Sequence, residues 1–224
     1  MRLHVQRSGS GTPPLVFVHG LGGSAATWDG CVRLLGARHE TVALDLLGHG
    51  GSPVPEDPAE YTRDLALNGI DDVLATLPAP AVLVGHSLGG YLALAHAATR
   101  PGVASAIIVL NTGPGFRDPV KREAWNERSR RNAHRFGVAP QATNLNLQHD
   151  AVVMERVAQI AVPTLVLAGE LDREEYRTSG RYLEGKMPHA HLEVIPGGEH
   201  NMQESHAADV AAAIERFVAA LSPR

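Results

Sequence analysis

The chain has little of several features that mark particular classes of protein. It contains one cysteine, Cys31, in 224 residues, which excludes an internal disulfide and a cysteine-based zinc cluster. Its 24 acidic residues outnumber its 20 basic residues and give a formal charge of −4, so we expect no nucleic-acid partner. The longest apolar run, at 106–110, is far shorter than the roughly 20 residues that cross a bilayer, so we expect no membrane partner.

The overall composition is that of an ordinary globular protein. Hydrophobic residues make up 44% and charged residues 20% of the chain, with 23 Gly and 15 Pro. The length suits one large domain around one core. Residues 1–7 contain no apolar stretch of the kind found in signal peptides, and we expect a cytoplasmic protein.

Short apolar runs of strand length alternate along the chain with segments of helical spacing. The predicted strands are 2–7, 15–19, 41–45, 81–85, 104–111, 164–169 and 191–195. The predicted helices are 28–35, 61–77, 88–99, 174–187 and 206–221. The runs at 81–84 and 107–110 are apolar at every position, which is typical of strands buried on both faces. The sequence therefore predicts an α/β fold with a parallel sheet covered by helices.

The segment 113–160 interrupts this alternation because it has no buried-strand run. Between 117 and 135 it carries seven arginine and lysine residues against three acidic ones. We expect an insertion with its own charge, which divides the chain into a first core part (1–112), the insertion (113–160) and a second core part (161–224).

The sequence Gly85-His86-Ser87-Leu88-Gly89 lies between a predicted buried strand and an Ala-rich helix. This strand-turn-helix setting is the one in which a G-x-S-x-G motif forms a nucleophile elbow, with the serine oxygen projecting above the sheet. Glycines are needed at both ends because side chains there would crowd the turn. The motif predicts Ser87 as a nucleophile.

A second glycine-rich loop, His19-Gly20-Leu21-Gly22-Gly23, also follows a predicted buried strand. Its glycines allow backbone N–H groups to turn toward a substrate oxygen. We expect the N–H groups of Leu21 and Leu88 to form an oxyanion hole.

A serine hydroxyl needs a base to accept its proton and an acid to orient that base. Two later strand ends supply both groups, in Gly169-Glu170-Leu171-Asp172 and in Gly198-Glu199-His200. We predict His200 as the base and Asp172 as the acid, with Glu170, Glu199 and Asp45 as rivals for the acid. Among these, Asp45 begins a glycine-rich loop and is expected to stabilise its turn.

Five motifs in this order resemble the α/β-hydrolase superfamily over nearly the whole chain. They are 19–22, the run Asp-Leu-Leu-Gly-His-Gly-Gly-Ser at 45–52, 85–89, 169–172 and 198–200. The resemblance implies the α/β-hydrolase fold, a mostly parallel central sheet flanked by helices. It also implies a triad of Ser87, Asp172 and His200, oxyanion amides at Leu21 and Leu88, and a cap formed by 113–160. That cap is shorter than the usual multi-helix lid of the family.

Apolar and basic side chains of the insertion are candidates for substrate binding. We expect Trp125, Phe116, Phe136 and Met154 to line an acyl or aromatic pocket or to pack the insertion onto the sheet. The arginines can form a solvated face or hold a substrate carboxylate. His189 and His191 have the spacing of metal ligands on a strand, but no acidic or cysteine partner accompanies them. We expect no metal and no cofactor.

The sequence therefore predicts a serine hydrolase that acts on a carboxylic ester, thioester or lactone of small size through an acyl-enzyme. Two alternatives stay open. One is a C–C bond hydrolase or lyase that uses the same triad on an anionic substrate. The other is a ligand-binding member without catalysis. The substrate and the oligomeric state do not follow from the sequence.

The resemblance extends to particular enzymes of the superfamily. Residues 111–112 and the segment around Trp125 resemble 3-oxoadipate enol-lactonases, while the overall pattern equally resembles small carboxylesterases and the pyruvate-eliminating enzyme of the menaquinone pathway.

Overall fold

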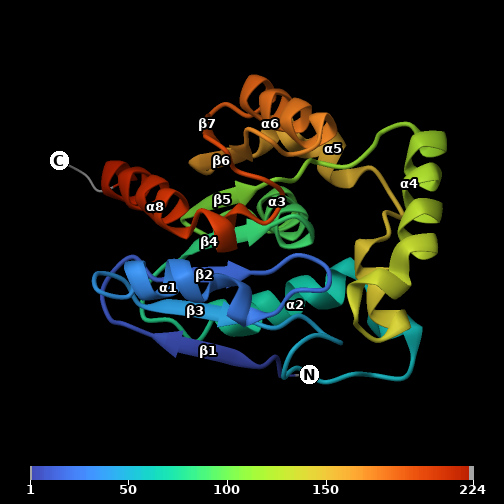
Figure 1. The fold of residues 1–224 in the computed structure, drawn as a ribbon, viewed down its shortest axis with the longest axis horizontal. Coiled ribbons are helices and arrows are strands. Elements are labelled where there is room, and N and C mark those ends of the chain that lie inside the picture. Colours follow the sequence, from blue (N-terminus) through green and yellow to red (C-terminus); the bar gives the residue numbers. More distant parts are fainter. Residues whose placement is uncertain (1, 222–224) are drawn as a thin grey trace.

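A seven-stranded sheet runs through the centre of the computed structural model, which describes residues 2–221 (Figure 1). The strand order is β1-β3-β2-β4-β5-β6-β7, and all neighbours pair in parallel except β1 and β3. The strands are β1 (Val5–Ser8), β2 (Leu15–Val18), β3 (Thr41–Leu44), β4 (Val82–His86), β5 (Ala106–Leu110), β6 (Thr164–Gly169) and β7 (Ala190–Ile195). This confirms the predicted mostly parallel sheet, and β4 lies at its centre.

Helices cover both faces of the sheet. They are α1 (Asp29–Leu35), α2 (Arg63–Leu74), α3 (Leu88–Thr99), α4 (Pro119–Asn132), α5 (Val152–Arg156), α6 (Glu174–Lys186), α7 (Met202–Ser205) and α8 (Ala207–Leu221). One buried cluster joins the sheet to α1 and α8, and the other joins it to α2, α3 and α6. Along β4, Leu83 belongs to one cluster while Val82 and Val84 belong to the other. Successive side chains of a strand point to opposite faces of the sheet, and both faces are buried here. Residues 82–84 of β4 are therefore all apolar.

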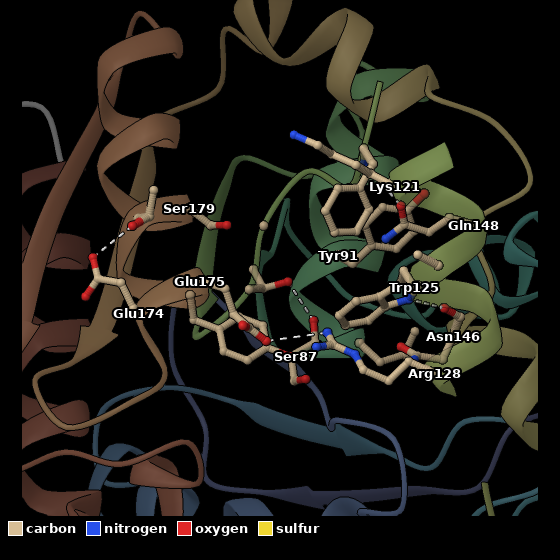
Figure 2. Close-up of a pocket in the computed structure, with 18 of the residues that line it drawn as sticks. Ser87, Tyr91, Lys121, Trp125, Arg128, Asn146, Gln148, Glu174, Glu175 and Ser179 are labelled. Carbon is tan, nitrogen blue, oxygen red and sulfur yellow. Dashed lines mark hydrogen bonds and ion pairs between the residues drawn. The ribbon is translucent and has the colours of Figure 1, made fainter. Parts of the chain in front are cut away.

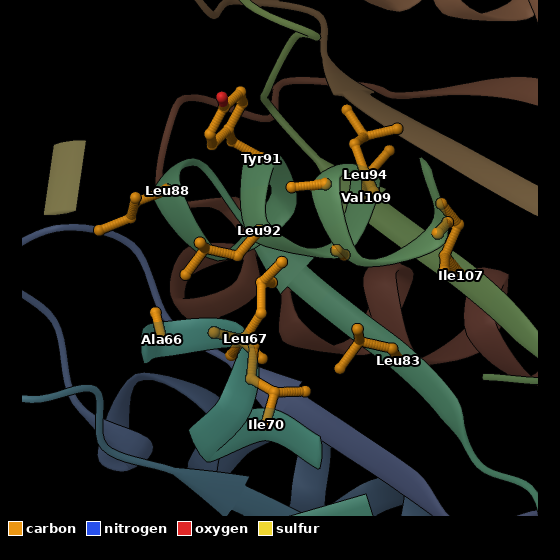
Figure 3. Packing of buried hydrophobic residues seen from close by; sticks show 14 of the residues in the cluster. Ala66, Leu67, Ile70, Leu83, Leu88, Tyr91, Leu92, Leu94, Ile107 and Val109 are labelled. Carbon is orange, nitrogen blue, oxygen red and sulfur yellow. The ribbon is translucent and has the colours of Figure 1, made fainter. Parts of the chain in front are cut away.

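Leucine, isoleucine and valine side chains fill the core beneath the α2 and α3 layer (Figure 3). Leu67 and Ile70 from α2 meet Leu92 from α3 and Leu83 from β4, and all four are fully buried. Fully burying one such side chain contributes about 1.5–3 kcal/mol. This layer fixes α3, and with it the turn that joins β4 to α3.

The segment 113–160 connects β5 to β6 and contains no strand. Its longest element, α4, stands beside the body of the molecule (Figure 1). The short 3-10 helices η3 (Ala133–Phe136), η4 (Pro140–Asn146) and η5 (Val157–Gln159), together with α5, complete the segment. Asp118 starts α4, because its side chain accepts hydrogen bonds from the N–H groups of Val120 and Lys121.

Most element boundaries differ from the predicted ones by only one or two residues. Two differences are larger. The predicted strand 2–7 begins only at Val5 and ends at Ser8, and the predicted helix 61–77 begins at Arg63 and ends at Leu74. Thr62 marks the start because its hydroxyl accepts a hydrogen bond from the N–H of Leu65, while the Tyr61 side chain is buried in the core. Within residues 2–221, no helix has the length and apolar character needed to span a membrane.

Candidate active site

Ser87 occupies a sharp turn between β4 and α3. Its backbone has a φ of 50° and a ψ of −111°, an unfavourable conformation for a residue with a side chain. The flanking glycines permit it, because a Cβ on Gly85 would lie 2.2 Å from the carbonyl oxygen of Gly89. A Cβ on Gly89 would lie equally close to the carbonyl oxygen of Val18. The predicted elbow is therefore built by backbone contacts that exclude any larger residue.

Ser87, His200 and Asp172 meet at the carboxyl ends of β4, β6 and β7. The hydroxyl of Ser87 lies 3.2 Å from Nε2 of His200. Nδ1 of His200 lies 2.9 Å from Oδ2 of Asp172, whose side chain is buried. With the proton of the imidazole on Nδ1, Ser87 donates to Nε2 and Nδ1 donates to the carboxylate. The structure thus brings together the three side chains that the sequence singled out.

Two side chains that the motif analysis did not assign to the site hold the backbone of His200. Nε2 of His86 donates to the carbonyl oxygen of His200 at 2.8 Å, and burial lowers the pKa of His86 to about 3. The amide nitrogen of Asn111 donates to the same oxygen at 2.8 Å, and its amide oxygen accepts from the N–H of Gly169. Asn111 has a φ of 47°. In the sequence, Asn111 is the last residue of the predicted strand 104–111 and part of the resemblance at 111–112, and neither indicates a contact with His200.

Two of the three rivals for the acid, Glu170 and Asp45, have other partners. Oε2 of Glu170 accepts a hydrogen bond from the N–H of Gly197 at 2.9 Å. Asp45 accepts from the N–H groups of Ala25 and Gly51. Burial alone would raise the pKa of Asp45, but these hydrogen bonds outweigh it and lower the pKa. Glu170 and Asp45 therefore brace loops, as expected for Asp45.

The two expected oxyanion donors are the backbone N–H groups of Leu21 and Leu88. Among residues 2–221, neither the N–H of Leu21 nor that of Leu88 donates to a protein acceptor. Leu88 begins α3, where the first N–H groups have no partner inside the helix. The loop before Leu21 passes close to the nucleophile, since a Cβ on Gly20 would lie 3.2 Å from Cβ of Ser87.

His19 braces this loop through both nitrogens of its ring. Its Nε2 accepts from the N–H of Leu46 at 3.0 Å, which leaves Nδ1 to donate to the carbonyl oxygen of Gly20 at 2.7 Å. The ring is fully buried, and this burial lowers its pKa to about 4. His19 therefore stays neutral and fixes the path of the backbone toward Leu21.

A pocket of about 680 Å³ opens at Ser87. Side chains from α3, α4 and α6 line it, together with residues of the loops at 112–116 and 146–148 (Figure 2). The rings of Phe116 and Trp125 are 5.9 Å apart, and the indole N–H of Trp125 donates to the carbonyl oxygen of Asn146. The guanidinium of Arg128 lies over the indole at 4.9 Å. This part of the pocket wall therefore consists of two aromatic rings with a guanidinium beside them.

Two of the four predicted pocket residues, Phe116 and Trp125, line this pocket, and the other two do not. Phe136 instead packs against the loop at Gly22, where a Cβ would lie 2.9 Å from the carbonyl oxygen of Phe136. Met154 is on α5, which packs against α3 away from the opening. The periodicity of 113–160 did not indicate which of its faces turns toward the serine.

Comparisons with known proteins agree with this fold. A model described as the alpha/beta hydrolase family matches residues 15–213. The pimeloyl-(acyl-carrier protein) methyl ester esterase of Xanthomonas campestris pv. campestris is 30% identical, and the alignment covers 98% of this chain and 100% of that protein. An uncharacterised protein of Mycobacterium tuberculosis is 38% identical over 112 residues. The alignment covers 50% of this chain and 32% of that protein, so the match spans about a third of the relative's length.

Two solved structures have the same fold. MenH from S. aureus superposes with a TM-score of 0.85 at 19% identity, covering 97% of this chain and 98% of MenH. The enol-lactonase from Burkholderia xenovorans LB400 superposes with a TM-score of 0.81 at 21% identity, covering 97% of this chain and 96% of the lactonase. Family match, full-length relative and sheet topology together identify the chain as a member of the alpha/beta hydrolase family.

Proposed function

We propose that the protein is a serine hydrolase that cleaves a carboxylic ester, thioester or lactone through an acyl-enzyme. The observation that carries the proposal is the hydrogen-bonded row from Ser87 through His200 to Asp172, with Ser87 held at the mouth of the pocket. The relative from Xanthomonas campestris is named as a methyl ester esterase, which supports action on ester bonds.

The geometry suits a two-step mechanism. His200 Nε2 takes the proton of Ser87 as its oxygen attacks the carbonyl carbon, and the buried carboxylate of Asp172 stabilises the resulting imidazolium. The free N–H groups of Leu21 and Leu88 stabilise the oxyanion. His200 then returns the proton to the leaving group. A water molecule, activated by the same imidazole, hydrolyses the acyl-enzyme.

The segment 113–160 acts as a cap in this proposal. It supplies Phe116 to the pocket lining, together with Trp125 and Gln148, which are labelled in Figure 2. An aromatic wall favours an apolar or aromatic group on the substrate and limits the access of water.

The test is Ser87→Ala assayed with p-nitrophenyl esters. Turnover should fall by about 10⁴-fold or more while the melting temperature is retained, because only the nucleophilic oxygen is removed. Ser205→Ala, at an exposed position of α7, is the matched control and should keep full activity. Full activity of Ser87→Ala would refute the proposal. A fluorophosphonate probe separates the non-catalytic alternative, since an unactivated Ser87 would not be labelled.

The charges around the pocket favour an anionic substrate as a second candidate. Both acidic residues of the pocket wall are paired: Glu174 with Arg177 and Arg181, and Glu175 with Arg128 and Arg173. Lys121 and Arg131 also line the pocket, and neither forms an ion pair within residues 2–221. These uncompensated cations support a C–C bond hydrolase or lyase that acts on a carboxylate.

The two candidates differ in the substrates that respond to charge removal. Arg131→Gln should raise KM for a dicarboxylate monoester several-fold and leave a neutral ester unchanged, if the substrate is anionic. Arg130→Gln is the matched control, because Arg130 is paired with Glu123 outside the pocket lining. Equal effects on charged and neutral esters would contradict the anionic candidate.

A further inference from the structure

Four residues after Asp172, Tyr176 also contacts the imidazole of His200. The rings of Tyr176 and His200 have their centroids 4.6 Å apart and their planes inclined by 35°. Tyr176 lies in the first turn of α6, where its N–H donates to the carbonyl oxygen of Arg173. One short stretch therefore contacts the imidazole twice, once through a carboxylate at Nδ1 and once through an aromatic ring.

Arg173 makes two contacts with the Tyr176 side chain. Its guanidinium carbon lies 4.8 Å from the centre of the phenol ring, and Nη2 donates to the phenol oxygen at 3.0 Å. Nη1 of the same guanidinium lies 3.5 Å from Glu175, which also pairs with Arg128 of α4. The phenol is thus fixed at its face and at its oxygen, and it cannot turn away from His200 without losing both contacts.

The hydrogen bond to Asp172 does not by itself prevent rotation of the His200 ring. A ring held only at Nδ1 can pivot about the line to Asp172, and this pivot carries Nε2 away from Ser87. His86 packs edge-on against the imidazole, with centroids 4.9 Å apart and planes inclined by 60°. Tyr176 adds a broad flat contact that opposes the pivot. An aromatic face also attracts a cation, which favours the imidazolium formed when Ser87 loses its proton.

We propose that Tyr176, backed by Arg173, is a positioning residue that keeps Nε2 of His200 directed at Ser87. This inference rests on the proposed serine hydrolase function. Its role is to orient the base, because the phenol oxygen is engaged by Arg173. A displaced base slows the chemical step, and a shift of about 1 Å can cost 10²-fold.

The experiment compares side chains with and without a ring at position 176. Tyr176→Leu and Tyr176→Met should each lower kcat for p-nitrophenyl acetate about 10-fold or more while KM changes less than about twofold. Tyr176→Phe keeps the ring and should retain kcat within about threefold. Tyr182→Leu, another tyrosine of α6 that does not line the pocket, is the matched control and should behave like the unmodified protein.

A second readout does not depend on the ester substrate. The rate of inactivation by diisopropyl fluorophosphate depends on the Ser87 and His200 pair, and it should fall in parallel with kcat in the leucine and methionine variants. If either ringless variant fails to fold, the other is scored, with melting temperatures measured for all.

Three outcomes would overturn the inference. A ringless variant that folds and keeps full kcat removes the positioning role. A rise in KM at constant kcat would make Tyr176 a substrate contact. An equal loss in Tyr176→Phe would assign the effect to the hydroxyl.

Ser87→Ala is assayed in the same experiment. If it stays active, the proposed function fails; if it is inactive while the ringless variants match the unmodified protein, only this inference fails.

Discussion

The nucleophile turn and the 113–160 segment are stabilised in different ways. Around Ser87, a Cβ on Gly85 or Gly89 would meet backbone atoms at 2.2 Å, so only one residue type fits. In the segment, Gly137 has a φ of 64° and no atom within 4 Å of where its Cβ would be. The turn is restricted by contact with other atoms, whereas this part of the segment is restricted only by its own backbone conformation.

A few polar side chains fix the segment in place. Within the segment, the side-chain amide of Asn126 forms two hydrogen bonds with the backbone of Gln148, at 2.9 and 2.8 Å. Arg63 of α2 binds both carboxylate oxygens of Asp150, and this pair raises the pKa of the guanidinium and lowers that of the carboxyl. The contrast teaches that backbone contacts leave no choice of residue at the nucleophile turn, while the segment is held by buried side chains such as Leu145 and Val157 together with replaceable hydrogen bonds and ion pairs.

The largest expected effect is that of Gly85→Ala. The new methyl group cannot fit unless the elbow backbone moves, so we expect a loss of about 3 kcal/mol in unfolding free energy together with loss of esterase activity. Urea denaturation and a p-nitrophenyl ester assay measure both. An alanine variant with the stability and activity of the unmodified protein would remove the contrast.

Acid should destabilise the core through its buried histidines. Burial holds the pKa of His86 at about 3 and that of His19 at about 4, against an ordinary value of 6.5. Below about pH 6.5 the unfolded chain binds protons that the folded chain does not, so stability falls by about 1.4 kcal/mol per pH unit for each group. This loss ends near pH 3 for His86 and near pH 4 for His19.

The measurement is the slope of unfolding free energy against pH between about 6 and 4, by urea denaturation. His86→Gln should reduce this slope by about 1.4 kcal/mol per pH unit, whatever its effect on stability at pH 7. An unchanged slope would show that His86 takes up a proton in the folded protein.

Trp125→Ala tests the pocket wall. Removing the indole deletes the contacts with Phe116 and Arg128 and the hydrogen bond to Asn146. KM for an aryl ester should rise about tenfold, equivalent to about 1.4 kcal/mol, with a smaller change in kcat. Trp125→Phe retains an aromatic surface and should lie in between. If KM is unchanged, the wall does not bind the substrate.

The smallest effect is expected from Gly137→Ala. Its left-handed backbone makes any side chain unfavourable, and the open surroundings add no clash, so the loss should be about 1 kcal/mol. Urea denaturation provides the value, and activity should be retained. A loss as large as that of Gly85→Ala would contradict the contrast between the two regions.

Much of the core could be predicted because its strands are buried on both faces. The residues 82–84 of β4 and the whole of β5 are apolar, and the predicted β6 matches the structure residue for residue. The elbow and the meeting of Ser87, Asp172 and His200 also followed from motifs, because each lies at the carboxyl end of a strand in a parallel sheet.

The contacts that refine the site could not be predicted in this way. Tyr176 reaches His200 because α6 starts directly after the Asp172 turn, and no spacing rule identifies which residue of the first turn faces the imidazole. Phe136 and Met154 have the same apolar character as Phe116, yet only the three-dimensional path of 113–160 decides which of them faces Ser87.

Because β5 pairs directly with β6, the segment 113–160 that connects them can change in length or sequence without changing the sheet. Ile107 lies opposite Thr164 and Leu110 opposite Leu167, so their register is set by the sheet and is independent of how many residues the chain uses to pass from one strand to the other. The Xanthomonas campestris relative aligns over 259 positions, more than the 224 residues of this chain. Lengthening or replacing the crossover would change what enters the pocket and leave the spacing of the reactive groups as it is.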